Sequence, residues 1–476
     1  MTALLWLRRD LRVHDHPALR AALDGDDAVV PVFCFDDALL TGRHASGART
    51  QFLLECLTEL DGALTDRGSR LFVRRGPPQH ELPLLARELG ADVVHCSADV
   101  GPFARRRQEQ VRQTLGAVAL RTHPGLFVVD RLAPIRTQAG EPYTVFTPFH
   151  RAWCRQPRRD VLGAPRALPA PPGTLAPGTL PRLTDLGLEQ ECSDPAPGGE
   201  QAGRDGLRRF LAGPVHEYAD GRDLLAGPAV SRLSPYLHFG CITPREIEQR
   251  LPGGMGPQAY RRQLCWRDFY AHVLGHFPAN SRSEYQRRYR GSIRWSRSRT
   301  RFEAWCAGNT GFPAVDAGMR QLRREGWMHN RARLLVGSFL TKDLGIDWRW
   351  GERWFMRFLL DGDEASNNGN WQWIASVGVD PQPAFRRIFN PGRQQQRFDP
   401  DGEYVRRYVP ELAHVPDRYL AAPWTMPTEV QADCGCRIGH DYPEPIVDHA
   451  HARRAALDRY RAEPGPGTDV SPAGAA

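Results

Sequence analysis

The chain has 476 residues, 41% of them hydrophobic and 25% charged, which is enough to bury the cores of two or three globular domains. Its formal net charge is +8, and Lys342 is the single lysine among 63 basic residues, so a phosphate loop ending in Gly-Lys-Ser/Thr is excluded. No apolar run approaches the roughly 18 residues of a membrane-spanning helix, and Arg8 and Arg9 interrupt any signal-like core, which predicts a cytoplasmic protein without membrane contact.

The first 130 residues alternate short β-rich runs with amphipathic stretches, among them the predicted helices 50–65 and 78–89. This alternation predicts an α/β domain, residues 1–130, built on a doubly wound parallel sheet. No G-x-G-x-x-G motif follows the first strand, so a dinucleotide site of that type is not predicted. The predicted strands are residues 3–7, 28–35, 70–74, 93–96 and 118–122.

The remaining chain divides into a connector, a helical domain and a tail. Residues 131–205 become rich in Pro and Gly after position 164, which predicts an interdomain linker. Residues 206–460 carry helical signals, including Ser234-Pro235 as a helix N-cap and the capping box from Thr243 to Glu246, and they form a predicted all-α domain. Residues 461–476, rich in Pro, Gly and Ala, are expected to be disordered.

Ten cysteines are scattered along the chain without a C-x-x-C pair. A chain of this size without a secretion signal needs no disulfides, so we expect reduced thiols. Cys434, Cys436 and His440 have the wrong spacing for a zinc site, and no metal is predicted.

Residues 327–373 interleave aromatic rings, amides and charges at short spacings. Such a mixture can hold a flat conjugated cofactor beside a flat nucleobase. Asn330, Arg333 and Leu334 stand at i, i+3 and i+4, so they share one helix face.

Two further clusters accompany this block. Ser231 and Ser234 flank Arg232 at a predicted helix start, where free N–H groups favour phosphate; a plain helix cap is the alternative. Gln263, Trp266 and Arg267 share a second helix face.

Together these blocks resemble the DNA photolyase/cryptochrome flavoprotein family, most closely its bacterial cyclobutane pyrimidine dimer photolyases, with a likeness to actinobacterial members. The resemblance implies an N-terminal antenna domain and a C-terminal helical FAD-binding domain. It also implies a reaction in which light-excited, reduced FAD passes an electron to a dimer flipped out of damaged DNA.

The resemblance further implies a set of FAD-binding residues. Arg333 is expected to pair with Asp361, and Asn367 to lie near flavin N5, where light-signalling relatives often carry Asp or Cys. Val230 departs from the Thr that is common at its position. The implied FAD-binding residues are Tyr218, Ser231, Arg232, Leu233, Ser234, Tyr260, Asn330, Arg333, Asp361, Gly362, Asp363 and Asn367.

For the lesion, the resemblance implies stacking walls at Trp266 and Trp373, and phosphate contacts from arginines such as Arg267 and Arg331. Gln263 departs from the common Glu, so no carboxylate assists the chemistry there; we still include Gln263 and Asn367 among the catalytic groups. The implied lesion- and DNA-binding residues are Arg222, Gln263, Trp266, Arg267, Asn330, Arg331, Leu334, Trp373 and Gln394.

Trp371, Trp348 and Trp295 match the family's chain of tryptophans that conducts an electron to the flavin, although three tryptophans outside that frame are more often core residues.

A second, light-harvesting chromophore is expected in the N-terminal domain. The acidic residue typical of folate binders is missing between Gly101 and Gln108, whereas residues 32–37 with Arg43 and Arg49 favour an 8-hydroxy-5-deazaflavin over methenyltetrahydrofolate. An empty pocket is the third possibility.

Two alternatives stay open beside a monomeric dimer photolyase: a (6-4) photolyase, which Gln263 favours, and a cryptochrome photoreceptor, against which Asn367 argues.

Overall fold

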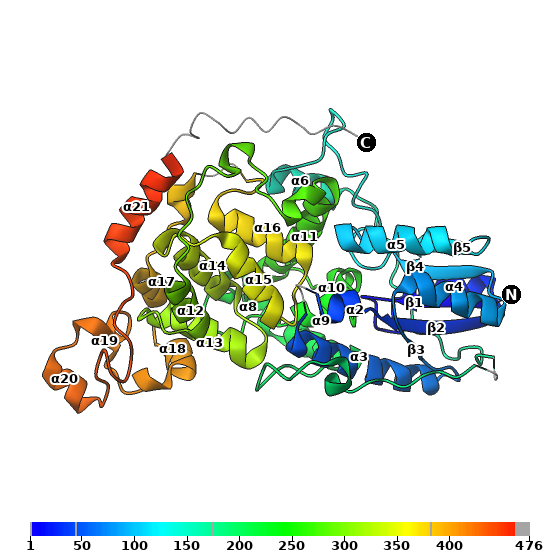
Figure 1. Cartoon of the computed structure of the whole chain (residues 1–476), viewed down its shortest axis with the longest axis horizontal. Helices are drawn as coiled ribbons and strands as arrows, with labels where there is room; N and C mark the ends of the chain where they lie inside the picture. Colours follow the sequence, from blue (N-terminus) through cyan, green and yellow to red (C-terminus); the bar gives the residue numbers. More distant parts are fainter. Residues whose placement is uncertain (1, 43–44, 173–174, 381–382, 462–476) are drawn as a thin grey trace.

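The computed structural model describes residues 2–42, 45–172, 175–380 and 383–461. A parallel sheet flanked by helices occupies one end of the long axis, and a larger helical part occupies the other (Figure 1). This is the predicted combination of an α/β and an all-α part. Among the described helices, none is both long and apolar enough to cross a membrane. Residues 462–476, where we expected disorder, lie outside the described residues.

The sheet has five parallel strands in the order β3-β2-β1-β4-β5, which confirms the predicted doubly wound topology. Leu4 of the central strand pairs with Val30 on one side and Val94 on the other, and all three are fully buried. Helices cover both faces, which is why β1 and β2 are continuous apolar runs. The strands are β1 (Thr2–Leu7), β2 (Ala28–Phe35), β3 (Phe72–Arg75), β4 (Val93–Ser97) and β5 (Ala119–His123).

Five helices belong to the sheet, and the predicted helix 78–89 is confirmed in full. The helix predicted from residue 50 starts earlier, at Gly47, because the Ser46 hydroxyl caps it by accepting from the Arg49 N–H at 3.1 Å. These helices are α1 (Pro17–Gly25), α2 (Asp37–Leu40), α3 (Gly47–Thr65), α4 (Pro78–Leu89) and α5 (Pro102–Thr114).

The connector between the two parts is packed rather than free. It contains α6 (Phe146–Cys154), which lies against α11 of the helical part. Phe149 and Trp153 are fully buried, and the Trp153 indole donates to Asp268 at 3.0 Å. A short 3₁₀ turn, Leu183–Leu186, packs on α3. Pro and Gly set the irregular path of this segment, but its few large apolar residues still join the core.

The helical part begins at α7. Thr243 caps α10 as predicted, by accepting from the Glu246 N–H at 2.9 Å. Ser234, predicted as an N-cap, is instead the first residue of α9, and Leu233 stands in the cap position. The helices are α7 (Glu200–Ala212), α8 (Pro214–Gly221), α9 (Ser234–Phe239), α10 (Pro244–Arg250), α11 (Met255–His276), α12 (Arg299–Ala307), α13 (Pro313–Glu325), α14 (Asn330–Ser338), α15 (Trp348–Phe358), α16 (Glu364–Ala375), α17 (Pro391–Phe398), α18 (Glu403–Tyr408), α19 (Asp417–Leu420), α20 (Thr428–Asp433) and α21 (His449–Arg461).

The single lysine lies in the π-helical turn (Phe339–Asp343) that follows α14. Lys342 is fully buried, and its Nζ donates to the carbonyl of Ala375, the last residue of α16, at 3.0 Å. Burial, together with the charges of Arg387 and Arg459, holds the pKa of this amine well below its usual range. The lysine therefore satisfies one of the open carbonyls at the end of α16.

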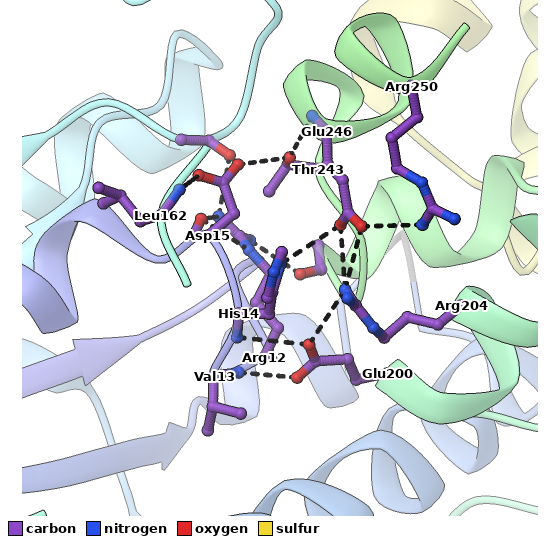
Figure 2. Close-up of polar contacts among 12 residues, drawn as sticks. Arg12, Val13, His14, Asp15, Leu162, Glu200, Arg204, Thr243, Glu246 and Arg250 are labelled. Atoms are coloured by element: carbon purple, nitrogen blue, oxygen red, sulfur yellow. Dashed lines mark hydrogen bonds and ion pairs between the residues drawn. The ribbon is translucent and has the colours of Figure 1, made fainter. Parts of the chain in front are cut away.

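Residues that follow β1 fasten the sheet to the helical part (Figure 2). Glu200 of α7 accepts from the backbone N–H groups of Val13 and His14, at 2.8 and 3.3 Å. The His14 ring lies 3.5 Å from Glu246 of α10, and Arg204 reaches the same carboxylate at 3.1 Å. One loop thus contacts two helices of the other part.

Asp15 occupies the centre of this junction and is fully buried. Its carboxylate receives the Thr243 hydroxyl at 2.6 Å, the Leu162 N–H at 3.0 Å and the forked guanidinium of Arg159. Burial would raise the pKa of Asp15, but the hydrogen bonds from Arg159 and Thr243 hold it below its usual range. These bonds also compensate for its left-handed backbone, with φ of 52°, which is uncommon for a residue other than glycine.

Candidate active site

A central pocket lies between α14, α15 and α16, the helices that carry the aromatic and amide block. α14 contributes Asn330, Arg333 and Leu334, which confirms that the i, i+3, i+4 spacing gathers these side chains on one face. Asn367 and Trp371 of α16 line the opposite side. Residues from three separate motifs therefore face one space.

An ion pair shapes one wall of this pocket. Arg333 Nη2 lies 2.8 Å from Asp361 Oδ2, as predicted, and Arg333 Nε donates to the Met328 carbonyl at 2.9 Å. The other carboxylate oxygen of Asp361 is buried and has no hydrogen-bond partner within the described residues. A buried acceptor of this kind needs a donor. The pocket thus presents an acceptor to any bound molecule that carries an N–H group.

Asn367 is held in one orientation by the neighbouring helix. Its Nδ2 donates to the Glu352 carbonyl of α15 at 3.0 Å, and the adjacent Asn368 donates to the Glu352 carboxylate at 3.1 Å. This arrangement leaves Asn367 Oδ1 as the amide group available to the pocket. The result is a neutral polar group at a fixed place beside mainly apolar walls.

The loop from Ser231 to Ser234 lies close to the start of α14. Ser231 Oγ and Tyr260 Oη are 2.9 Å apart, and Ser234 Oγ accepts from the Trp327 indole at 3.2 Å, three residues before Asn330. Arg232 has a positive φ of 54° and lies 4.3 Å over the Trp327 ring. The two hydroxyls predicted to contact phosphate are therefore both anchored by aromatic side chains.

Tyrosine rings back this loop. Tyr218 meets Tyr260 edge to face at 5.0 Å between centroids. Burial raises the pKa of Tyr260 to about 12, although its bond to Ser231 opposes the shift, so the phenol stays protonated at neutral pH. A neutral hydroxyl can donate toward an anion where a phenolate would repel it.

Asp363 and Gly362, predicted beside the cofactor, line a different space. Asp363 Oδ2 lies 2.6 Å from Arg9 Nη2 in the sheet part, and Oδ1 caps α16 through the Ser366 N–H at 2.8 Å. Burial would raise the pKa of Asp363, but the charges of Arg9 and Arg267 hold it far below its usual range. Its carboxylate is thus occupied in joining the two parts.

That space is an interdomain cavity of about 450 Å³. It opens where the strand order reverses between β1 and β4, at the carboxyl ends of the strands, which is the usual ligand position in a doubly wound sheet. Its walls include Trp6, flanked by the guanidinium groups of Arg8 at 4.5 Å and Arg107 at 5.5 Å from the ring centre. Arg43, which the sequence pointed to here, lies outside the described residues.

The predicted lesion walls are rigidly held. Trp266 stacks on Phe146 of α6, with ring centres 3.7 Å apart and an interplanar angle of 2°. The Trp373 indole donates to Asp380 at 3.0 Å, and the Arg387 guanidinium lies 4.1 Å from the centre of its ring. Each indole therefore has one face covered by protein. Gln263 and Gln394 are half-buried.

The arginines predicted to meet DNA differ in their surroundings. Arg267 points inward and donates to the carbonyls of Leu126 at 2.6 Å and Leu237 at 3.3 Å, with its side chain only 15% exposed. This geometry does not support the phosphate contact that we expected from Arg267. Arg331 is paired with Asp223 at 2.8 Å and is 20% exposed, and Arg222 ends α8.

The three tryptophans of the expected electron chain lie on segments next to or within α15. A Cβ atom on Gly351 would lie 2.1 Å from the Trp371 ring, so this ring rests on the helix one turn after Trp348. Trp348 is fully buried. Trp295 is next to Ser296, whose N–H donates to the Gly345 carbonyl at 2.7 Å, just before α15. Trp295 and Trp348 thus lie on neighbouring segments.

Comparisons with known proteins agree with this geometry. Residues 3–172 match the DNA photolyase family, and residues 260–462 match the FAD binding domain of DNA photolyase. The chain is 44% identical to a deoxyribodipyrimidine photo-lyase of Streptomyces griseus over 96% of its own length and 99% of that protein. The chain belongs to the DNA photolyase family.

Solved photolyase and cryptochrome structures share its whole architecture. A bacterial class III photolyase from Agrobacterium tumefaciens aligns with a TM-score of 0.89 at 35% identity. The alignment covers 96% of this chain and 97% of the Agrobacterium chain. A cryptochrome from Synechocystis has the same TM-score at 30% identity, with 96% and 98% covered. Proteins named photolyase and cryptochrome thus share this fold, so the fold alone does not distinguish the two.

Several pocket residues of this photolyase-family chain escaped the sequence reasoning. Phe355 of α15, Leu359 directly after α15 and Ile374 of α16 line the pocket as apolar walls. Their helical spacing showed a buried face but not what that face encloses. Glu352, which orients Asn367 through its backbone carbonyl, had no signal in the sequence. Within the described residues no group of His, Cys, Asp and Glu could hold a metal ion.

Proposed function

We propose that this chain is a deoxyribodipyrimidine photolyase, which binds FAD and uses blue light to split cyclobutane pyrimidine dimers in DNA. The observation that carries the proposal is the central pocket, where the Arg333–Asp361 pair faces Asn367 with Trp371 beside it. The full-length likeness to a named photo-lyase supports the same reaction. When bound and reduced, FAD supplies the light-excited electron that cleaves the dimer.

The pocket fits the polar edge of a flavin. The unpartnered Asp361 oxygen offers an acceptor to an imide N–H, and Arg333 fixes the carboxylate in place. Asn367 presents an amide oxygen that stays neutral whatever the redox state of the flavin ring. Ser231 and Ser234 would hold the diphosphate, with the protonated Tyr260 behind them.

The decisive experiment is a repair assay with oligonucleotides that carry a thymine dimer or a (6-4) photoproduct. We expect reconstituted, reduced protein to restore the dimer substrate only under blue light. Repair of the (6-4) substrate alone, or stable FAD binding without any repair, would assign the chain to the alternatives, a (6-4) photolyase or a cryptochrome. Failure to bind FAD after reconstitution contradicts all three.

The lesion face has a separate test. Phe146 stacks on one face of Trp266 and Arg387 lies over one face of Trp373, and a flipped base would stack on the opposite faces. We expect Trp266→Ala to weaken binding of damaged DNA by about 1–3 kcal/mol while binding of undamaged DNA hardly changes. Trp424→Ala, which removes an exposed indole that packs on Phe312, is the control. Equal loss for both DNAs would remove Trp266 from the lesion pocket.

The antenna chromophore is proposed to be an 8-hydroxy-5-deazaflavin in the interdomain cavity. A volume of about 450 Å³ is within the range of small-molecule pockets, and Trp6 offers a flat surface. The arginines around Trp6 favour a chromophore that carries negative charge. Extraction of the protein from its native host should release a deazaflavin; a released pterin would point to the folate instead.

A cytoplasmic monomer remains part of this proposal. All ten cysteines are free thiols, which suits a reducing compartment. Sedimentation of the purified protein with and without DNA checks the monomer.

A further inference from the structure

Trp371, the tryptophan that lines the central pocket, packs against two segments that carry further tryptophans. Trp348 lies one helical turn from Gly351, on which the Trp371 ring rests. Trp305 of α12 lies on another side, with ring centres 6.3 Å apart and an interplanar angle of 71°. Trp348 and Trp305 are both fully buried. Oxidised Trp371 therefore has two candidate electron donors, Trp348 and Trp305.

The two candidate donors differ in what their indole N–H groups contact. The Trp305 indole donates to the neutral carbonyl of Val336 at 3.1 Å. The Trp348 indole instead points at the Glu284 carboxylate, with Nε1 and Oε1 3.5 Å apart. Glu284 is only 3% exposed, so water screens its charge weakly.

The carboxylate is held in place by arginine. Arg349 Nη2 lies 2.7 Å from Glu284 Oε2, and Arg349 also contacts Asp347 at 3.2 Å. Burial lowers the pKa of Arg349, but its bonds to Glu284 and Asp347 outweigh this and raise it. The guanidinium lies 4.8 Å from the Trp348 ring centre. Glu284 thus shares its arginine with Asp347, but only Glu284 contacts the Trp348 indole N–H.

We infer that Glu284 makes Trp348 the preferred electron donor to Trp371 and so directs the electron path away from Trp305. In this step one electron passes from neutral Trp348 to oxidised Trp371, so Trp371 returns to the neutral state and Trp348 becomes a radical cation. Only the electron is transferred in this step, and the indole N–H remains directed at the carboxylate. The negative charge beside this N–H stabilises the cation, as a neutral carbonyl does not. An external thiol finally returns the electron through Trp295.

The inference rests on the proposed function, because light-excited FAD is what oxidises Trp371. Its test is transient absorption of the FAD-loaded enzyme, which follows the tryptophan radicals after a light flash. Glu284→Gln keeps the size and an acceptor oxygen but removes the charge and leaves Arg349 over the ring. We expect a roughly tenfold or larger drop in the yield of long-lived tryptophan radicals, since a unit charge at this distance in a buried site is worth at least that factor.

Two variants control this result. Asp347→Asn removes a carboxylate that contacts the same arginine but not the Trp348 indole. The asparagine still caps the helix. It should leave the yield near that of the native protein. Glu284→Asp, which restores the charge at a slightly greater distance, should recover part of the yield.

Trp305 tests the direction of the path. In the native background Trp305→Phe should leave the radical yield unchanged. In the Glu284→Gln background it should lower the yield further, because there Trp305 and Trp348 both donate electrons to Trp371. The inference is overturned if Glu284→Gln keeps the native yield, if Asp347→Asn is equally damaging, or if Trp305→Phe alone abolishes the radicals.

A dark measurement separates this inference from the proposed function. The Trp348 indole N–H resonance of the loaded enzyme, assigned through its loss in Trp348→Phe, should shift upfield in Glu284→Gln. An unchanged resonance means that the contact does not exist in solution and contradicts the inference. Repair by chemically reduced enzyme tests only the proposed function, and it should not depend on Glu284.

Discussion

Asp361 and Asp363 stand two residues apart, and each pairs with an arginine, but they belong to different regions of the molecule. Asp361 pairs with Arg333 inside the helical part, lines the central pocket, and has one oxygen without a partner among the described residues. Asp363 pairs with Arg9 of the sheet part, and its second oxygen caps α16. The comparison shows that one turn can leave a carboxylate oxygen of Asp361 open to a ligand while both oxygens of Asp363 hold the fold together.

The largest expected effect is on stability. Asp363→Asn keeps a helix-capping side chain but removes the charge that faces Arg9 and Arg267. Breaking a largely buried ion pair costs about 3–5 kcal/mol, and Arg9 would keep only its longer contact with Asp99, at 3.5 Å. Urea unfolding of the purified protein measures this loss. A loss below about 1 kcal/mol would mean that the junction is not held by this carboxylate.

Asp361→Asn should lower FAD affinity more than the free energy of unfolding. We expect FAD affinity to fall about 10- to 100-fold, because a hydrogen bond to a charged acceptor contributes about 1.5–3 kcal/mol. The free energy of unfolding without FAD should fall less than in Asp363→Asn, since Arg333 keeps its bond to Met328. Titration of both variants with FAD makes the comparison; equal affinities would contradict it.

The two regions should also differ in how their contributions to stability depend on pH. His329 caps α14 through the Arg331 N–H at 3.1 Å, and burial lowers its pKa to about 4. Because the unfolded state binds the proton first, this histidine contributes stability above about pH 6.5 that is lost as the pH falls toward 4. The lowered pKa of Asp363 makes its contribution persist until the pH falls below 3.8.

His329→Asn should therefore reduce the slope of unfolding free energy between pH 6.5 and 4 by about 1.4 kcal/mol per pH unit at most, the value for one proton. Asp363→Asn should leave that slope unchanged. Urea unfolding series at several pH values give both slopes. A slope that His329→Asn does not alter would place the acid-sensitive group elsewhere.

The smallest effect on stability is expected where there is space to fill. Leu53 of α3 lines the interdomain cavity, so Leu53→Trp should occupy it at a cost of less than about 1.5 kcal/mol. Binding of the antenna chromophore should be lost while FAD content stays native. Absorption spectra of protein from the native host check both, and loss of FAD would show that the two spaces are not independent.

The sequence was sufficient for the local part of this comparison. Helical spacing placed Asn330, Arg333 and Leu334 on one face, and strand–helix alternation predicted the sheet, because both depend on periodicity within one element. The Arg333–Asp361 pair was expected only through the family resemblance. Partners far apart in the chain were not accessible in this way.

Asp363 and Arg9 are 354 residues apart, so no local pattern links them. Arg267 shares a helix face with Trp266, but the loop after β5 and helix α9 cover it through the carbonyls of Leu126 and Leu237. Periodicity gives the face of a helix; it does not show which neighbour covers that face. The inward direction of Arg267 therefore required the structure.

Lys342 gives the molecule a built-in reporter. Its amine is the single lysine side chain, and it is bound to the end of the helix that carries Asn367 and Trp371. An amine-reactive reagent can acylate it only when that helix end opens to solvent. The rate of acylation, read by mass spectrometry, would therefore time local opening beneath the cofactor pocket without any engineered label.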